Sequence, residues 1–139
     1  MVEKYIKFNG NYTKVLSCDQ CKAGIVTLNE NIRIICDSAF QDCKHIRGIN
    51  LPQNLEVIEE NAFKDCSGLT EISIPASVSA IGESAFAGCS KLENIEIPKT
   101  VINIKTGAFS DSKFEQVTLN KGCNYKDALP ATCKTIEFY

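Results

Sequence analysis

The feature that most constrains the fold is an alanine–phenylalanine pair that recurs every 23 residues. The four phenylalanines are each preceded by alanine, giving Ala39-Phe40, Ala62-Phe63, Ala85-Phe86 and Ala108-Phe109. The best-preserved copy of the surrounding sequence runs from Leu69 to Lys91, LTEISIPASVSAIGESAFAGCSK. An internal period of this length is typical of stacked supersecondary units, which bury their hydrophobic faces against their neighbours. The sequence therefore predicts a solenoid.

Each unit carries a short strand pattern in which one apolar residue stands on each side of a polar one. This alternation is the period of a half-buried strand. These pairs are Val26/Leu28, Ile49/Leu51, Ile72/Ile74, Ile95/Ile97 and Val117/Leu119. Pro52, Pro75 and Pro98 end three of the strands at the same place because proline cannot donate to a ladder. Further apolar residues, such as Val78 and Ile81, are expected to point inward from the opposite side of each coil. The Ala-Phe pair is expected in a short helical turn.

The two ends of the repeat are irregular. Lys4 to Leu16 is predicted to form a β-hairpin, because two runs of β-formers flank Asn9-Gly10, a dipeptide favoured in type I′ turns with two positive φ angles. We interpret residues 1–22 as an N-terminal hairpin cap. Four to five repeats of about 23 residues occupy 23–119, starting at Ala23, although Phe114 arrives after 22 residues. Residues 120–139 are expected to be an irregular C-terminal cap or a truncated repeat, so 1–139 is a single domain.

Charge and hydropathy restrict the kinds of partner. The formal net charge is −2, and the 15 Lys and Arg are scattered, so nothing indicates nucleic acid or an anionic membrane as partner. No apolar stretch approaches the ~20 residues of a membrane span. The N-terminal sequence MVEKYIKFNGNY lacks the apolar core of a secretory signal. We expect no nucleic-acid binding and no membrane insertion, in a chain that starts in the cytosol or is a piece of a longer protein.

Cysteine recurs with the same period as phenylalanine. Cys43, Cys66 and Cys89 each lie three residues after a repeat phenylalanine, and Ser112 takes the fourth place. Cys21 precedes Leu28 by seven residues, as Ser112 precedes Leu119. A small, weak S–H donor at a recurring corner can satisfy backbone groups while packing as a hydrophobe. We therefore interpret these positions as a structural ladder, consisting of Cys21, Cys43, Cys66, Cys89 and Ser112.

The Cys18-Asp19-Gln20-Cys21 motif has alternative interpretations as a redox pair or as half of a zinc site. The redox version requires a following helix, which the pattern does not predict, and the zinc version lacks a second Cys pair. The structural ladder is preferred, and no metal or cofactor is expected. Cys123 and Cys133 each align with the Val78 position of their own unit, which favours buried free thiols over a disulfide.

Catalytic motifs are absent from the sequence. The one histidine, His45, lies at a coil corner, and there is no Ser-His-Asp set, phosphate-binding glycine loop or carboxylate pair at a motif spacing. The sequence therefore predicts a protein that is not an enzyme. Asn11-Tyr12-Thr13 is a glycosylation sequon, which we interpret as a chance triplet because no signal peptide is visible.

The remaining candidate site is the outward row of the predicted sheet. Strand alternation places two files of side chains away from the core. The first contains Thr27, Asn50, Ser73, Glu96 and Thr118, and the second contains Ile25, Gly48, Glu71, Asn94 and Gln116. The tentative binding residues are Thr27, Asn50, Ser73, Glu96, Thr118, Glu71, Asn94 and Gln116. Because the files lack aromatic residues and arginine, the types enriched in hot spots, a flat, polar and weak contact is expected, with simple solvation of the sheet as the alternative.

With the repeat written as L-x-x-I-x-I-P-x-S-V-x-x-I-G-x-x-A-F-x-x-C, the chain resembles the BspA-type leucine-rich repeat family from roughly Ala23 to Leu119. It departs from the pattern where Glu59 and Lys105 replace the glycine found at Gly82. The resemblance implies a leucine-rich-repeat solenoid with a parallel β-sheet on its concave side and short strands or turns on its convex side. Such modules are known mainly from surface and secreted proteins of bacteria and parasitic protists, where they act as adhesins or protein-binding scaffolds.

Three hypotheses for function follow. The first is a non-enzymatic protein-binding module, adhesin-like and located at the cell surface or secreted, with an unidentified protein partner. The second is an intracellular, cytoplasmic scaffold or regulatory protein, suggested by the missing signal and by cysteines that look reduced. The third is a thiol or zinc protein that uses Cys18 and Cys21. Open strand edges at both ends of a solenoid also make end-to-end self-association an expectation.

Overall fold

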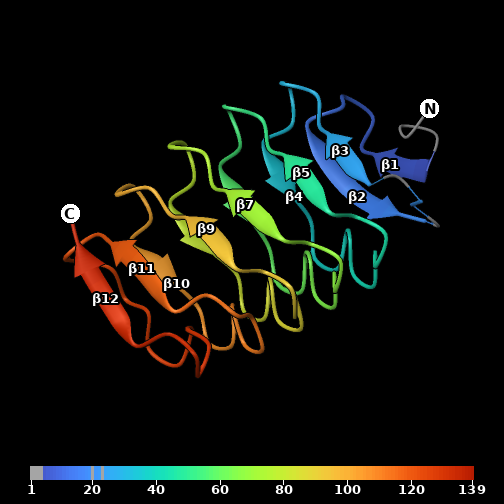
Figure 1. Cartoon of the computed structure of the whole chain (residues 1–139). Helices are drawn as coiled ribbons and strands as arrows, with labels where there is room; N and C mark the ends of the chain where they lie inside the picture. The colour runs from blue at the N-terminus through green and yellow to red at the C-terminus, as the bar shows by residue number, and fades with distance from the viewer. Residues whose placement is uncertain (1–4, 20, 23) are drawn as a thin grey trace.

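The chain forms a stack of similar coils that advances steadily from the N-terminus to the C-terminus (Figure 1). The computed structural model describes residues 5–19, 21–22 and 24–139; Lys4, Gln20 and the predicted repeat start Ala23 lie outside them. The strands of the described residues are β1 Ile6–Phe8, β2 Lys14–Cys18, β3 Ile25–Thr27, β4 Ile34–Ile35, β5 Gly48–Asn50, β6 Val57–Ile58, β7 Glu71–Ser73, β8 Ala80–Ile81, β9 Asn94–Glu96, β10 Asn103–Ile104, β11 Gln116–Leu119 and β12 Thr135–Phe138.

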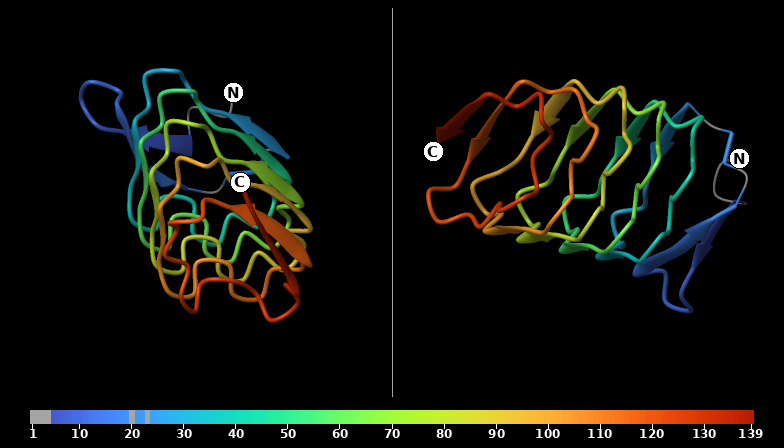
Figure 2. Two further views of the ribbon diagram at one scale, coloured as in Figure 1. Left: turned by 90° about the vertical axis from the view of Figure 1, so that its left-hand side faces the viewer. Right: turned by 90° about the horizontal axis from the view of Figure 1, so that it is seen from below.

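The strands form two rows on different sides of the coils (Figure 2). One row is a six-stranded sheet with the order β1-β2-β4-β6-β8-β10, parallel except for the antiparallel pair β1-β2. The other row contains the strands predicted for the concave sheet, and here three two-stranded parallel sheets, β3-β5, β7-β9 and β11-β12, follow one another. The predicted parallel solenoid is confirmed, but the second row is not one continuous ladder.

The core is a column of identical residues placed above one another by the repeat. Phe40, Phe63, Phe86 and Phe109 are fully buried, and their rings stack with centroid separations of 5.1, 5.1 and 5.3 Å. The alanine before each phenylalanine is also buried, where the corner leaves room only for a small side chain. The 23-residue period thus stacks equivalent side chains along the axis of the solenoid.

The corners that carry the Ala-Phe pairs are successive β-turns, not the predicted helical turns. In the corner that carries Ala39-Phe40, the amides of Ala39, Gln41 and Cys43 donate to the carbonyls of Cys36, Ser38 and Phe40. The amide of each repeat phenylalanine donates to an alanine carbonyl in the next coil, as the Phe40 amide donates to the Ala62 carbonyl at 2.7 Å. Two residues per corner have positive φ, in the series Ser38, Asn61, Ser84 and Gly107 and the series Asp42, Asp65, Gly88 and Asp111. Left-handed residues at this spacing prevent a right-handed helical turn.

The N-terminal hairpin is present, but its turn differs from the prediction. Asn9 and Gly10 do not adopt the two positive φ angles of a type I′ turn; the left-handed residue of this loop is Tyr12, with φ 57°. The Asn9 carboxamide oxygen accepts bonds from the amides of Thr13 and Lys14, so a side chain closes the loop. Strand β2 also pairs in parallel with β4, which makes the hairpin part of the larger sheet.

The C-terminal segment continues the repeat. Strand β12 pairs in parallel with β11, with Val117 opposite Ile136. The Phe109 amide donates to the Ala128 carbonyl at 2.8 Å, as the Phe86 amide donates to Ala108. Ala128-Leu129 therefore occupies the place of the missing Ala-Phe pair, which residue identity alone did not reveal.

Candidate binding face

The candidate site is the surface formed by the side chains that β3, β5, β7, β9 and β11 turn away from the core. We call it the polar sheet face; it consists of Thr27, Asn50, Ser73, Glu96, Thr118, Ile25, Gly48, Glu71, Asn94 and Gln116. All of them are exposed except Gly48 and Thr118, which are half-buried. The middle residue of each strand, such as Ile72, packs into the core. Strand alternation thus brings both predicted files onto one surface.

Hydrogen bonds across the polar sheet face follow the pairing of the strands. Asn50 Nδ2 donates to Thr27 Oγ1 at 2.9 Å across β3 and β5. Ser73 Oγ donates to Glu96 Oε2 at 3.1 Å across β7 and β9. These contacts leave the Glu71 and Asn94 side chains, in the neighbouring file, without such a bond among the described residues.

Two hollows open on this face. The first lies over β7 and β9 and is lined by Glu71, Ser73, Asn94 and Glu96, together with the edges of Ile72 and Ile95. The second lies between β9 and β11 and is lined by Glu93, Asn94, Lys113, Phe114, Glu115, Gln116 and Thr132. Asn94 lines both hollows. Sequence reasoning did not select Glu93, Lys113, Glu115 and Thr132 because they flank the strands.

The second hollow coincides with the shortened repeat. Ser112 is two residues before Phe114, whereas the equivalent Cys89 is three residues before Leu92. The Lys113 amide therefore reaches the Leu92 carbonyl at 2.9 Å, and β9 and β11 do not pair. One missing residue shifts the approach to β11, although β5 and β7 also do not pair at the full spacing of 23 residues.

The two hollows carry charges of both signs, with more carboxylates than ammonium groups. The carboxylates belong to Glu71, Glu93, Glu96 and Glu115, and Lys113 provides an ammonium group. The carboxamides of Asn94 and Gln116 can both donate and accept hydrogen bonds. This set of groups can form hydrogen bonds and ion pairs with a polar surface.

The predicted cysteine ladder positions line the buried corner on another side of each coil. Cys43 Sγ donates to the Cys18 carbonyl at 3.8 Å, Cys66 Sγ to Phe40 at 3.1 Å and Cys89 Sγ to Phe63 at 3.2 Å. Each thiol therefore binds the backbone of the preceding coil. Burial raises the pKa of Cys66, and it raises the pKa of Cys89 to about 12.

Ser112 occupies the next rung but does not make the equivalent bond. Its side chain is 3% exposed, and its Oγ has no hydrogen-bond partner. A C–O bond is shorter than a C–S bond, so we attribute the missing bond to a hydroxyl that falls short of the carbonyl that a thiol would reach. Cys21, which the sequence predicts as the first rung, is buried in the core.

Side chains at another corner form a second ladder that the sequence did not predict. Ser77 Oγ donates to the Leu55 carbonyl, and Thr100 Oγ1 donates to the Val78 carbonyl at 3.0 Å. Asn120, at the position of Pro75 and Pro98, donates through Nδ2 to the Lys99 carbonyl at 2.6 Å. Hydroxyl and carboxamide groups thus link neighbouring coils at this corner.

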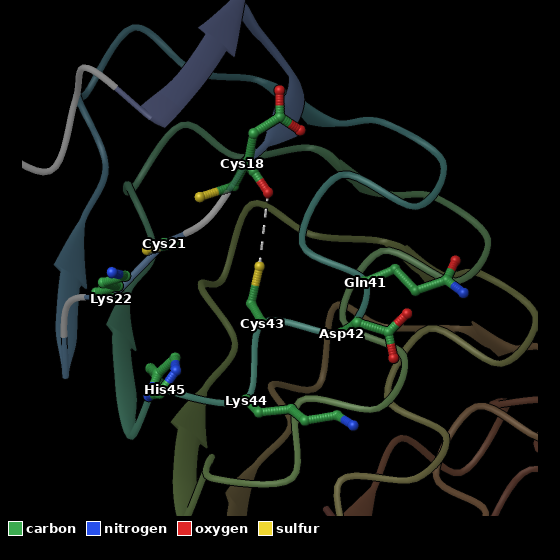
Figure 3. Close-up of a pocket in the computed structure, with 9 residues that line it drawn as sticks. Cys18, Cys21, Lys22, Gln41, Asp42, Cys43, Lys44 and His45 are labelled. Atoms are coloured by element: carbon green, nitrogen blue, oxygen red, sulfur yellow. Dashed lines mark hydrogen bonds between the residues drawn. The ribbon is translucent and has the colours of Figure 1, made fainter.

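Both cysteines of the CxxC motif line a pocket at the N-terminal end of the stack (Figure 3). Its lining consists of Cys18, Asp19, Cys21, Lys22, Gln41, Asp42, Cys43, Lys44 and His45. The Cys18 thiol points toward Cys21, whereas Cys43 points toward the Cys18 carbonyl (Figure 3). A hydrogen bond with the Cys43 thiol and burial raise the pKa of Cys18. A raised pKa disfavours the thiolate that nucleophilic chemistry and metal binding require.

Neither disulfides nor metal-binding groups are found in the described part of the chain. None of the eight cysteines forms a disulfide, and no group of three or more His, Cys, Asp or Glu side chains among the described residues is placed to hold a metal ion. Cys123 is buried and bonds through its amide to the Asn120 carbonyl, as Val78 bonds to Pro75. Cys133 is half-buried, and its position in the coil corresponds to that of Leu92 and not to that of Val78. The amide of the next residue, Lys134, donates to the Glu115 carbonyl, as the amide of Glu93 donates to the Thr70 carbonyl.

Comparison with solved structures identifies the fold. A leucine-rich repeat protein from Bacteroides ovatus superposes with a TM-score of 0.78 at 23% identity, covering 95% of this chain and 39% of that one. TpLRR of T. pallidum gives a TM-score of 0.67 at 19% identity, covering 96% of this chain and 79% of that one. The pneumococcal vaccine antigen PcpA gives 0.63 at 24% identity, covering 91% and 33%. The chain therefore spans about two fifths of the Bacteroides protein and a third of PcpA.

Sequence comparison agrees with this fold. No curated protein sequence matches the chain. The family model for the BspA type leucine-rich repeat region matches residues 15–137 in six copies. Within the described ranges, no helix is long and apolar enough to cross a membrane. With the stacked coils, the phenylalanine column and the family match in agreement, this chain belongs to the BspA-type leucine-rich repeat family.

Proposed function

We propose that this chain is a non-enzymatic protein-binding module and that its polar sheet face contacts a partner protein. The observation that carries the proposal is the pair of adjoining hollows that share Asn94. They interrupt an otherwise flat surface with carboxylates, carboxamides and one ammonium group, which are groups suited to hydrogen-bonded recognition. Pairing of β7 with β9 and of β11 with β12 holds these side chains on strands, so little ordering cost accompanies binding.

Two similarities support a cell-surface or secreted location. A leucine-rich cell surface protein from Faecalibacterium prausnitzii superposes with a TM-score of 0.55 at 24% identity, covering 85% of this chain and 42% of that one. PcpA is described as a vaccine antigen. An adhesin-like role in a longer repeat array follows from this proposal, because several weak polar contacts gain strength through multivalency.

The chemistry of the pocket at Cys18 and Cys21 supports a function without enzyme activity. His45 is the only histidine of the chain, and the thiols beside it are buried, with a raised pKa at Cys18. The remote alternative, a thiol or zinc protein using Cys18 and Cys21, predicts bound metal or thiol turnover that a Cys21→Ser variant loses. Metal analysis of protein purified without chelator, followed by that comparison, tests it.

Partner capture by charge-altered variants tests the binding proposal. Asn94→Arg places a bulky cation in both hollows, so we expect at least a tenfold loss of affinity for a captured partner. Lys14→Glu, at an exposed position on β2 of the other sheet, is the control and should retain binding. Equal retention by both variants, or equal loss, would contradict a contact through the polar sheet face.

The absence of disulfides favours a second candidate, an intracellular scaffold or regulatory protein. None of the eight cysteines forms a disulfide in the structure, and thiols persist mainly in reducing compartments. Alkylation of native protein under denaturing, non-reducing conditions distinguishes the two candidates. Eight alkylated thiols with a cytosolic pool of the protein would favour the intracellular candidate, and disulfides would favour the extracellular one.

We also propose end-to-end self-association as a property of the open stack. Strands β3 and β12 each pair on one side only, and unpaired edges of parallel strands can accept another strand. Sedimentation at increasing protein concentration measures this association. A sedimentation coefficient that does not change with concentration would contradict it.

A further inference from the structure

We propose that Asn11 is an N-glycosylation site when the chain passes through a secretory pathway that carries out this modification. Asn11-Tyr12-Thr13 is the only Asn-x-Ser/Thr triplet in the chain, and tyrosine at the middle position is compatible with the acceptor motif. The sequence alone gave no reason to distinguish it from a chance triplet. The structure supplies three reasons, which are its position, its exposure and the free nitrogen of Asn11.

The first reason is position. The hairpin loop that carries Asn11 projects from the side of the coil stack in both views of Figure 2. A transferase must enclose an acceptor segment, and a projecting loop offers such a segment without unfolding of the coils. Most asparagines of the coils lie instead at strands or tight corners bonded to a neighbouring coil.

The second reason is the exposure of the triplet. Asn11 is exposed, Tyr12 is 61% exposed and Thr13 is half-buried. Tyr12 adopts a left-handed φ of 57°, which brings Asn11 and Thr13 to the same side of the loop. Thr13 Oγ1 donates to Asn11 Oδ1 at 2.8 Å.

The third reason is that the reacting atom is unoccupied. Asn11 Oδ1 accepts bonds from Thr13 Oγ1 and from Asn9 Nδ2. No acceptor in the described part of the chain bonds Asn11 Nδ2. The loop itself depends on the Asn9 side chain, which binds the amides of Thr13 and Lys14, so substitution of Nδ2 removes no bond that holds the hairpin.

The chemistry requires a lipid-diphosphate-linked oligosaccharide as co-substrate. Asn11 Nδ2 forms a bond to the anomeric carbon of the sugar, and the bond between that carbon and the phosphate oxygen breaks. The lipid diphosphate leaves with the bonding electron pair, and the proton lost by Nδ2 passes to a base of the transferase. The product is a glycan joined through a neutral amide to the hairpin loop.

The location of this glycan has a structural consequence. Strand β1 is the edge of the six-stranded sheet, and the hairpin lies on the opposite side of the stack from β3, β5 and β7 (Figure 2). A bulky hydrated group at Asn11 would therefore shield the β1 edge from pairing with another chain. It would leave the polar sheet face open, so partner binding by unglycosylated protein tests the proposed function separately.

Expression of the full chain behind a cleavable signal in a eukaryotic secretory host tests the inference. Intact mass should increase by a glycan that peptide N-glycosidase removes. Asn11→Gln and Thr13→Ala should both abolish the increase, whereas Thr13→Ser should retain it because the hydroxyl is kept. Asn31→Gln, at an exposed asparagine outside any sequon, is the matched control and should stay glycosylated.

Secreted, folded protein with the unmodified mass would overturn the inference. A circular dichroism spectrum and a thermal melt show that the secreted chain is folded. A glycan that persists in Asn11→Gln would equally overturn it, since the modified residue would then lie elsewhere.

Discussion

At the scale of single residues, Ser112 shows how strictly the ladder depends on the length of one side chain. Cys66 and Cys89 reach the carbonyls of the preceding coil at 3.1 and 3.2 Å, while the Ser112 hydroxyl is buried without a partner. Serine was expected to take part in the ladder because its hydroxyl can donate a hydrogen bond. Its side chain is shorter than that of cysteine, which outweighs this ability.

We expect Ser112→Cys to stabilise the protein. A thiol at this position should bond to the carbonyl of the preceding coil and remove an unsatisfied buried hydroxyl, raising the free energy of unfolding by about 1 kcal/mol. Urea denaturation measures the change. Ser90→Cys, at an exposed position, is the control and should have no effect; a destabilised Ser112→Cys variant would contradict the interpretation of the ladder.

The buried thiols also predict a pH dependence of stability. Burial raises the pKa of Cys89 from 9.0 to about 12 and raises that of Cys66. Above pH 9 the unfolded chain releases these protons while the folded chain keeps them. The free energy of unfolding should therefore fall as the pH rises from 9 to about 12. Denaturation at several pH values in this range should show a smaller fall for a Cys66→Ala/Cys89→Ala variant, and an identical fall would contradict this origin.

At the scale of elements, the corners explain why a helical turn was predicted and not formed. An Ala-Phe pair flanked by polar residues has no sequence signal against a helical turn. The competing interaction lies one coil away, because the Phe63 amide donates to the Ala85 carbonyl at 2.7 Å. Residues such as Ser38 and Asp42, with φ of 59° and 62°, turn the backbone so that this bond can form.

Hydrogen exchange tests this description of the corners. The amides of Phe40, Phe63, Phe86 and Phe109 should exchange slowly, because each is buried and bonded to the next coil. The exposed turn residue Gln53 provides a fast-exchanging comparison within the same chain. Exchange of the four phenylalanine amides at the rate of Gln53 would contradict the inter-coil bonds.

At the scale of the whole molecule, the protein is a one-dimensional stack in which each coil contacts its neighbours. The phenylalanine column is continuous from Phe40 to Phe109, and the larger sheet runs alongside it from β1 to β10. Stability should therefore be nearly a sum of neighbour contacts. A residue with a ring on both sides should contribute more than one with a ring on a single side.

Alanine substitution along the column measures this gradient. Phe86→Ala removes a fully buried ring stacked between Phe63 and Phe109, and should cost about 3–5 kcal/mol from lost burial and a cavity. Phe40→Ala should cost about 1 kcal/mol less, because Phe40 stacks on Phe63 alone. Chemical denaturation provides both values. A cost below about 1 kcal/mol for Phe86→Ala would place this ring outside the coil interior.

The sequence by itself determined the architecture. A 23-residue period with alternating strand positions and a repeated Ala-Phe pair specifies stacked parallel coils, because identical residues can pack above one another only if each unit has the same path. Strand alternation likewise determined which residues, such as Asn94 and Glu96, point away from the core. These inferences needed only local patterns and their repetition.

The tertiary structure decided everything that depends on the exact distance between coils. It determined that β9 and β11 separate and form a hollow, that Ser112 falls short of a carbonyl, and that Ala128-Leu129 completes a coil. Hydrogen bonds depend on separations of a few tenths of an ångström, whereas a repeat pattern specifies position only to the nearest residue. The hollows of the candidate face therefore became visible only when the coils were placed against one another.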